Sequence, residues 1–137
     1  MGDNSEVIRR YRDAVESGDL STMSVLLDDF GTDDFVQEWP QSGERLRRDA
    51  SKRLSTEYAD KTGTNPKMSL GDIKTCGDLA VIEGTIDYGN GVPVRYVGIA
   101  EFRDGKVSRV REYFADPFEA PEWRAPYVEQ MAAAEKS

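Results

Sequence analysis

One carboxylate interrupts an apolar strand face in the segment VSRVREYFAD. Side chains alternate between the two faces of a strand, so Val110, Glu112 and Phe114 share one face. Arg109 and Arg111 share the other face. Burying an unpaired polar group costs about 1 to 3 kcal/mol, and burying a charge costs more. Glu112 is therefore paired, exposed to water, or used in chemistry.

Two other acids lie in strand-like segments, Glu38 in FVQEW and Asp87 in GTIDY. If these two converge with Glu112 in one hollow, repulsion and partial desolvation raise the pKa of at least one carboxyl group. Such a group acts as general acid or base, in proton transfer next to a carbonyl or in hydration and dehydration. We predict Glu112 as the main acid, with Glu38 and Asp87 in support. The structural alternative for Glu112 is an ion pair with a nearby arginine.

Aromatic side chains could complete such a site. Alternation in PVRYVGIAEF turns Tyr96 inward, with Gly98 leaving room beside it, and Tyr11 lies on an apolar helical stripe. Either hydroxyl could donate a hydrogen bond to a developing enolate oxygen. A core tyrosine is the alternative for Tyr11. Trp39 and Trp123 are expected to wall or cover the cavity.

The chain has 137 residues, no histidine and a single cysteine, Cys76. Ser-His and Cys-His nucleophile pairs, histidine-ligated zinc and thiolate metal clusters are therefore excluded. Neither a G-x-G-x-x-G motif nor a Walker loop occurs. We expect no metal site, and carboxylates, tyrosines, tryptophan N–H groups and water must carry any catalysis.

Composition limits the partners. With 38% hydrophobic and 32% charged residues, the chain fits one globular domain over residues 1–137. Its 26 acidic and 18 basic residues give a net charge of -8, which opposes binding to nucleic acid or anionic membranes. Small neutral or cationic partners are easier to accommodate. No apolar run approaches the roughly 20 residues that span a bilayer, and no signal-peptide region is evident, so we expect a cytoplasmic protein.

The N-terminal half has helical periodicity. Apolar spacing predicts a helix over residues 6–17, ended by Gly18, and a second helix directly after it. FVQEW predicts a strand that Pro40 stops. A third helix is predicted from apolar residues that recur every four positions, namely Leu46, Ala50, Leu54 and Tyr58.

The C-terminal half changes to strands. Four are predicted, in KMSLGDIKT, LAVIEGTIDY, PVRYVGIAEF and KVSRVREYF, and the last three form an antiparallel meander through hairpin signals such as GNG and DG. Helices segregated beside an antiparallel sheet define an α+β fold. The Pro-rich tail, residues 118–137, is expected to pack through Trp123 and Tyr127 before it frays.

This order of elements, with VIRRYRDAVESGDL, DDFVQEWPQSGERLRR and GIAEFRDGKVSRVREYFAD in sequence, resembles the SnoaL-like polyketide cyclase family of the nuclear transport factor 2-like superfamily. The resemblance covers residues 7–117. It implies a cone in which a curved antiparallel sheet packs around three N-terminal helices, with an apolar pocket, and usually a homodimer. Such relatives use pocket carboxylates without an organic cofactor.

Other superfamily members are matched only in part. Limonene epoxide hydrolases use an Asp-Arg-Asp set; Asp87 and Glu112 stand at its two acids, but Thr85 replaces the arginine. Ketosteroid isomerases use a tyrosine on the first helix, a base before a proline and a protonated Asp. Tyr11 matches the first, Trp39 stands at the base position, and Gly98 replaces the Asp.

SnoaL-type cyclases use an acid near the end of the last strand for intramolecular aldol ring closure. Both Glu112 and Asp116 in REYFAD are candidates for it. Strand parity favours Glu112, which alternates with Val110 and Phe114 on the face expected to line the pocket, whereas Asp116 lies at the end of the strand beside Pro117. Asp116, before a proline, has a turn or cap as its alternative. The resemblance places Thr85 and Asp87 in the pocket, whereas periodicity alone buries the apolar set of the same strand.

The sequence thus predicts a pocket protein for a small hydrophobic ligand, with carboxylate-mediated proton transfer of cyclase, isomerase or dehydratase type on a carbonyl-containing substrate. The alternative is a non-catalytic binding or dimerising module on the same fold. An enzyme should bring at least two acids within hydrogen-bond reach of one ligand atom. A binding module should show an apolar or filled hollow, with the acids paired to Arg109, Arg111 or solvent.

Overall fold

A computed structural model describes residues 3–132. The helices are α1 (Ser5–Glu16), α2 (Thr22–Phe30) and α3 (Arg48–Thr62), followed near the end by a short 3-10 helix, η1 (Glu122–Tyr127). The strands are β1 (Gly31–Trp39), β2 (Glu44–Arg47), β3 (Lys67–Cys76), β4 (Leu79–Asp87), β5 (Val94–Arg103) and β6 (Lys106–Ala115).

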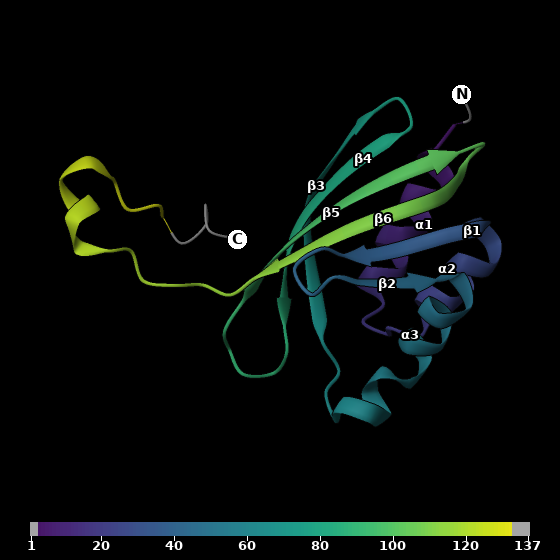
Figure 1. Cartoon of the computed structure of the whole chain (residues 1–137), viewed down its shortest axis with the longest axis horizontal. Helices are drawn as coiled ribbons and strands as arrows, with labels where there is room; N and C mark the ends of the chain where they lie inside the picture. The colour runs from purple at the N-terminus through teal and green to yellow at the C-terminus, as the bar shows by residue number, and fades with distance from the viewer. Residues whose placement is uncertain (1–2, 133–137) are drawn as a thin grey trace.

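The six strands form one curved, open sheet in the order β2-β1-β6-β5-β4-β3, and the three helices cover one of its faces (Figure 1). The predicted α+β architecture is confirmed. The sheet is mixed, however, and not wholly antiparallel, because β1 runs parallel to β6 while every other neighbouring pair is antiparallel. The chain therefore brings Gln37 of β1 beside Val110 of β6, across a large separation in sequence.

Two predicted boundaries were wrong in the region around β1. The strand begins at Gly31, four residues before the FVQEW segment, and pairs with a short strand, β2, that the sequence did not indicate. Leu46 lies in β2, so the third helix begins only at Arg48. The sequence ERLR of β2 is mostly charged and exposed, and therefore lacks the apolar alternation that marks a strand.

The core lies between the helices and the concave face of the sheet. On β5 the buried set includes Tyr96, Ala100 and Phe102, as alternation predicted. On β4 the apolar set with Ile82 and Ile86 is buried, so periodicity was right for this strand and the pocket placement implied by family resemblance was wrong. Burying the apolar set removes more hydrocarbon from water, which favours this face.

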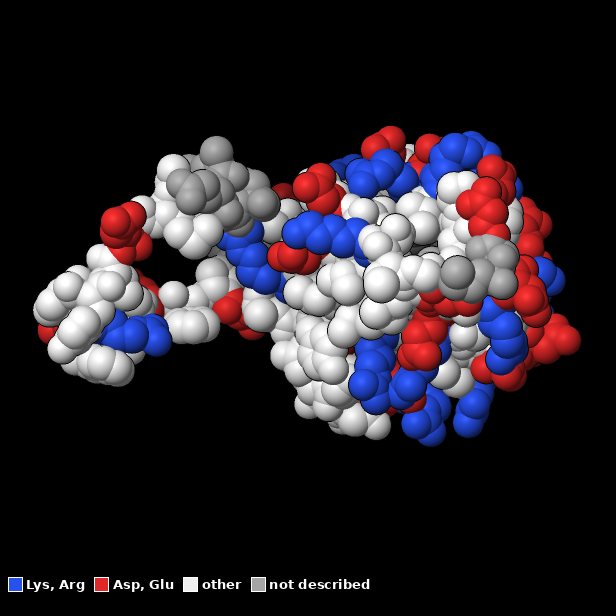
Figure 2. All heavy atoms as spheres, turned by 90° about the horizontal axis from the view of Figure 1, so that it is seen from above, with Lys and Arg blue, Asp and Glu red and all other residues white. Residues whose placement is uncertain are grey.

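In the tail after β6, the aromatic residues of the segment around η1 do not pack on the domain. Trp123 is 72% exposed and Tyr127 is 82% exposed, which contradicts the packing predicted for them. Figures 1 and 2 show the segment around η1 standing apart from the body. Pro117 lies two residues after the end of β6 and Pro121 four residues further on. Proline cannot donate to a strand ladder, so the chain leaves the sheet here. Residues 133–137 of the predicted tail lie outside the described residues.

Candidate functional site

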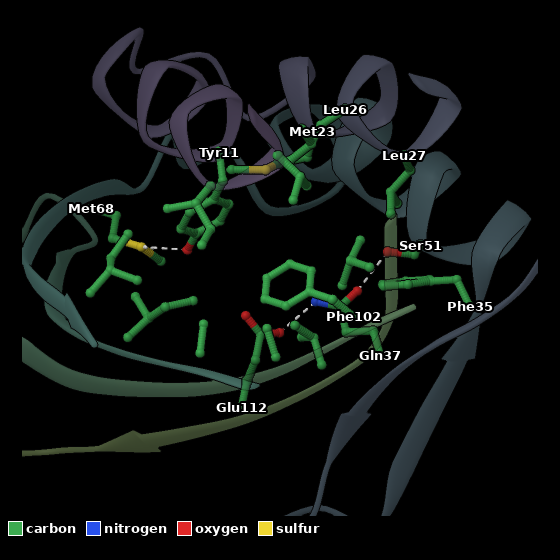
Figure 3. Close-up of a pocket in the computed structure, with 18 of the residues that line it drawn as sticks. Tyr11, Met23, Leu26, Leu27, Phe35, Gln37, Ser51, Met68, Phe102 and Glu112 are labelled. Atoms are coloured by element: carbon green, nitrogen blue, oxygen red, sulfur yellow. Dashed lines mark hydrogen bonds between the residues drawn. The ribbon is translucent and has the colours of Figure 1, made fainter. Parts of the chain in front are cut away.

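Glu112 projects from β6 into the hollow between sheet and helices, where Gln37 lies beside it (Figure 3). Three donors hold its carboxylate. Oε1 accepts hydrogen bonds from Nε2 of Gln37 at 2.5 Å and from Nε1 of Trp39 at 2.9 Å. Oε2 accepts one from the hydroxyl of Tyr96 at 2.5 Å. Among residues 3–132, no arginine or lysine forms an ion pair with Glu112, and its hydrogen-bond partners are neutral.

Tyr96 reaches the carboxylate across a glycine. Gly98 is the cross-strand partner of Glu112, and a Cβ placed on Gly98 would lie 2.5 Å from the Tyr96 hydroxyl oxygen. The ring of Tyr96 therefore occupies the space over Gly98, as the sequence suggested. Burial raises the pKa of Tyr96 well above its ordinary value, and the charge of Glu112 raises it further. The hydroxyl consequently stays protonated and acts as a donor.

Tyr11 on α1 adds a second buried hydroxyl to the cavity. It donates to Sδ of Met68 at 3.7 Å (Figure 3). Burial, and then the negative charge of Glu112, raise its pKa above the ordinary value of tyrosine. Tyr11 is thus a protonated cavity group, placed where it can turn toward a polar atom of a ligand.

Gln37 links the carboxylate to α3. The hydroxyl of Ser51, a buried residue of α3, donates to Oε1 of Gln37 at 2.6 Å. This bond fixes which end of the Gln37 amide faces Glu112, so that its N–H points at the carboxylate. Neither Gln37 nor Ser51 was predicted as a site residue. The only signal was that Gln37 shares a strand face with Phe35, opposite Glu38.

The hollow has two chambers that meet at Glu112. The inner one, of about 180 Å³, is closed by the helices and is lined almost wholly by apolar side chains, including Val7, Leu27, Phe35, Ile82 and Phe102. The outer chamber, of about 500 Å³, is lined by Trp39, Tyr58, Tyr88, Phe114 and Glu44 among others. Four residues, Leu20, Gln37, Met68 and Glu112, line both chambers. A ligand could therefore occupy both chambers and pass Glu112 at the junction.

Glu38 lies on the opposite face of the sheet from this hollow. Its carboxylate binds Arg109 at 2.7 Å and Arg45 at 2.8 Å, and Nε of Arg111 lies 3.5 Å away. The hydrogen bonds from Arg109 and Arg45 lower the pKa of Glu38 to about 2. The expected convergence of Glu38 with Glu112 is therefore wrong, because adjacent residues of β1 face opposite ways and Gln37 takes the inward position.

The remaining predicted residues divide between the cavity and the surface. Asp87 is exposed, and its Oδ1 accepts the backbone N–H of Gly89 in the turn after β4. Thr85 shares the outward face of that strand and lines neither chamber. Asp116 is exposed beyond the end of β6. Tyr11, Trp39, Tyr96, Phe114 and Glu112 do line the hollow, whereas the exposed Trp123 does not.

Two negative findings concern residues 3–132. No group of three or more His, Cys, Asp or Glu side chains is arranged to hold a metal ion. No helix in this range is long and apolar enough to cross a membrane.

Helices packed on one face of a curved sheet, with a carboxylate in the hollow between them, define a class of small pocket proteins. The family model described as SnoaL-like domain matches residues 8–110, so the chain belongs to the SnoaL-like family. No match was found among curated proteins.

Among solved structures, an NTF-2 like protein of unknown function from Burkholderia xenovorans LB400 is 35% identical, with a TM-score of 0.72, over 93% of this chain and 94% of that one. A candidate ketosteroid isomerase from Kribbella flavida DSM 17836 is 24% identical, with a TM-score of 0.77, over 95% and 90% of the two chains. IdmH, a candidate polyketide cyclase from Streptomyces antibioticus, is 16% identical, with a TM-score of 0.62, over 82% and 91%. The two latter likenesses concern the fold.

Proposed function

We propose that this protein binds an apolar, carbonyl-containing small molecule in the hollow and transfers a proton through Glu112, without a cofactor. The reaction would be of cyclase, isomerase or dehydratase type. Support comes from one observation above the others, the single carboxylate held at the junction of an apolar chamber and an open one. A ligand that spans both chambers would place its carbon skeleton against this carboxylate.

The hydrogen bonds of Glu112 support a role as base. A carboxylate has about four lone-pair sites. Three accept protein donors, two on Oε1 and one on Oε2, which leaves one on Oε2 for a substrate proton. The neutral donors fix the direction of that lone pair without supplying a neutralising cation. Tyr11, whose hydroxyl donates only to the sulfur of Met68, would then donate to the enolate oxygen that develops.

A second candidate is ligand binding without turnover. It is favoured by the position of the other acids, because Glu38 is paired with Arg109 on the outer face and Asp87 caps a turn. Among residues 3–132, only one carboxylate, that of Glu112, lines the inner chamber, and a reaction that needs two acids on one ligand atom there is not supported.

The test is exchange of α-protons in D2O. Native mass spectrometry of protein purified from its own host identifies the bound compound, and apolar ketones such as 2-tetralone extend the series. Wild-type protein should accelerate deuterium incorporation next to the carbonyl, and Glu112→Gln should lose at least about 100-fold of that rate, the typical contribution of a positioned base. Bound ligand with no exchange in the wild type would favour the binding module.

We also propose a homodimer formed through the convex face of the sheet. Val81, Val97 and Ile99 point outward there and remain half-exposed in the single chain. Such an apolar row on an otherwise charged surface supports an interface.

A further inference from the structure

The outer chamber carries negative charge and no opposing positive charge. Its two charged lining residues are Glu112 and Glu44, and no lysine or arginine lines either chamber among residues 3–132. The nearby arginines on the sheet, Arg45 and Arg109, turn to the convex face and bind Glu38. The charge of the hollow is thus left to solvent or to a ligand.

The chamber also has aromatic walls. Four aromatic residues line it, namely Trp39, Tyr58, Tyr88 and Phe114. The rings of Trp39 and Phe114 meet edge to face with centroids 6.4 Å apart, and the Trp39 indole N–H donates to Glu112. Aromatic rings and a carboxylate therefore border the same space.

The electrostatic surroundings of Tyr88 agree with this arrangement. Burial raises the pKa of its hydroxyl, and Tyr58, Glu112 and Asp116 raise it further. Of these neighbours, Glu112 and Asp116 are acidic and disfavour a further negative charge on Tyr88. Glu112 lines the chamber, so an anionic ligand such as a free carboxylate or phosphate would be repelled there.

We propose that the outer chamber binds a small organic cation, a protonated tertiary amine or a quaternary ammonium group, carried by a ligand whose apolar part enters the inner chamber. Aromatic faces attract such a cation through their quadrupoles, and the carboxylate of Glu112 supplies a counter-charge. A metal ion fits less well, because no group of three metal-binding side chains occurs among the described residues. If the ligand is also the substrate, its reacting carbon would lie beside Glu112, and that part of the inference rests on the proposed function. The binding of the cation does not depend on it.

The experiment compares choline with 3,3-dimethylbutan-1-ol, which has the same shape but carries an uncharged carbon in place of the nitrogen. The chain contains two tryptophans, so a 1H–15N spectrum has two indole N–H signals. Trp39 borders the chamber, whereas Trp123 is 72% exposed in the tail and is a control within the same molecule. Both titrations are made at matched ionic strength.

Choline should produce a saturable shift of the Trp39 indole signal and should bind at least about tenfold more tightly than the neutral alcohol, while the Trp123 signal stays still. Phe114→Leu and Glu44→Gln should each weaken choline binding, and the tail variants Trp123→Leu and Glu119→Gln should leave it unchanged. Equal affinity for the two compounds, or no saturable shift of Trp39 with choline, would overturn the inference.

The outcomes separate this inference from the proposed function. Exchange of ketone α-protons that depends on Glu112, combined with no preference for choline, removes the cation site alone. Preference for choline without any such exchange removes catalysis and keeps the cation site.

Discussion

The placement of the Glu112 carboxylate depends on a neighbour that has no side chain. Gly98 faces Glu112 on the adjacent strand and leaves the space in which the Tyr96 hydroxyl lies. The two nearest ring carbons of Tyr96 also lie 3.1 and 3.2 Å from the Cβ position of an alanine there. Any side chain at position 98 therefore moves the ring of Tyr96 and separates its hydroxyl from the carboxylate.

We predict that Gly98→Ala costs about 1 to 3 kcal/mol of unfolding free energy, the usual range for overpacking a core. The cost should be smaller in a Tyr96→Phe background, because the hydroxyl is the atom in closest conflict. Urea unfolding of the four proteins measures this double-mutant cycle. Gly71→Ala on β3 is the control, since a Cβ there meets its nearest atom at an ordinary 3.4 Å. Additive costs would contradict the packing described for Tyr96.

Sequence alternation placed residues correctly wherever one face of a strand was clearly apolar. On β5 and β6 the inward positions of Tyr96 and Glu112 follow from their apolar neighbours. On β1 both faces mix apolar and polar side chains near the site: Gln37 lies between Phe35 and Trp39 on one face, and Glu38 follows Val36 on the other. In so short a segment, alternation alone does not decide which polar side chain faces the hollow. Glu38 faces the convex side because β1 pairs with β2 and β6, and arginines of these two strands form ion pairs with Glu38 there.

The elements β1, β2 and β6 are joined on the convex face through Glu38. We predict that Glu38→Gln lowers the unfolding free energy by about 1 kcal/mol at pH 7, because its partners remain partly exposed to solvent. The folded-state pKa of about 2 lies below the ordinary value of 4.5. The stabilisation by Glu38 is therefore complete above pH 4.5 and is lost as the pH falls toward 2.

Urea unfolding at pH 7 and at low pH measures this dependence. The difference between wild type and Glu38→Gln should shrink as the medium is acidified, and Glu119→Gln on the exposed tail should show no such dependence. A difference that grew on acidification would mean that Glu38 is not held ionised by the arginines.

At the scale of the whole molecule, the sequence predicted the helices and the main strands of the domain, but not the course of the C-terminal tail. Helical and strand periodicities, with turn signals, indicated the order of the elements from α1 to β6 except for the short strand β2. The tail gave a misleading signal, since Trp123 and Tyr127 suggested packing yet lie exposed. Apolar residues in a sequence indicate which side chains tend to be buried. The proline that follows β6 ends the strand pairing, and the chain then leaves the sheet.

The proposed homodimer makes a prediction at this scale. Light scattering should give twice the chain mass, and Val97→Lys together with Ile99→Glu should yield the single-chain mass with the far-UV spectrum unchanged. The physical reason is that charges on the convex face would be buried unpaired in the interface. Monomeric wild-type protein at micromolar concentration would contradict the proposal, while leaving the pocket of each chain intact.

The central claim is that one inward carboxylate, Glu112, makes this hollow reactive. The most direct measurement compares α-proton exchange in Glu112→Gln and Glu38→Gln, whose acids lie on adjacent strands but on opposite faces of the sheet. We predict that Glu112→Gln loses at least about 100-fold of the exchange rate while Glu38→Gln retains it. Equal rates in both variants and the wild type, or a loss confined to Glu38→Gln, would contradict the account.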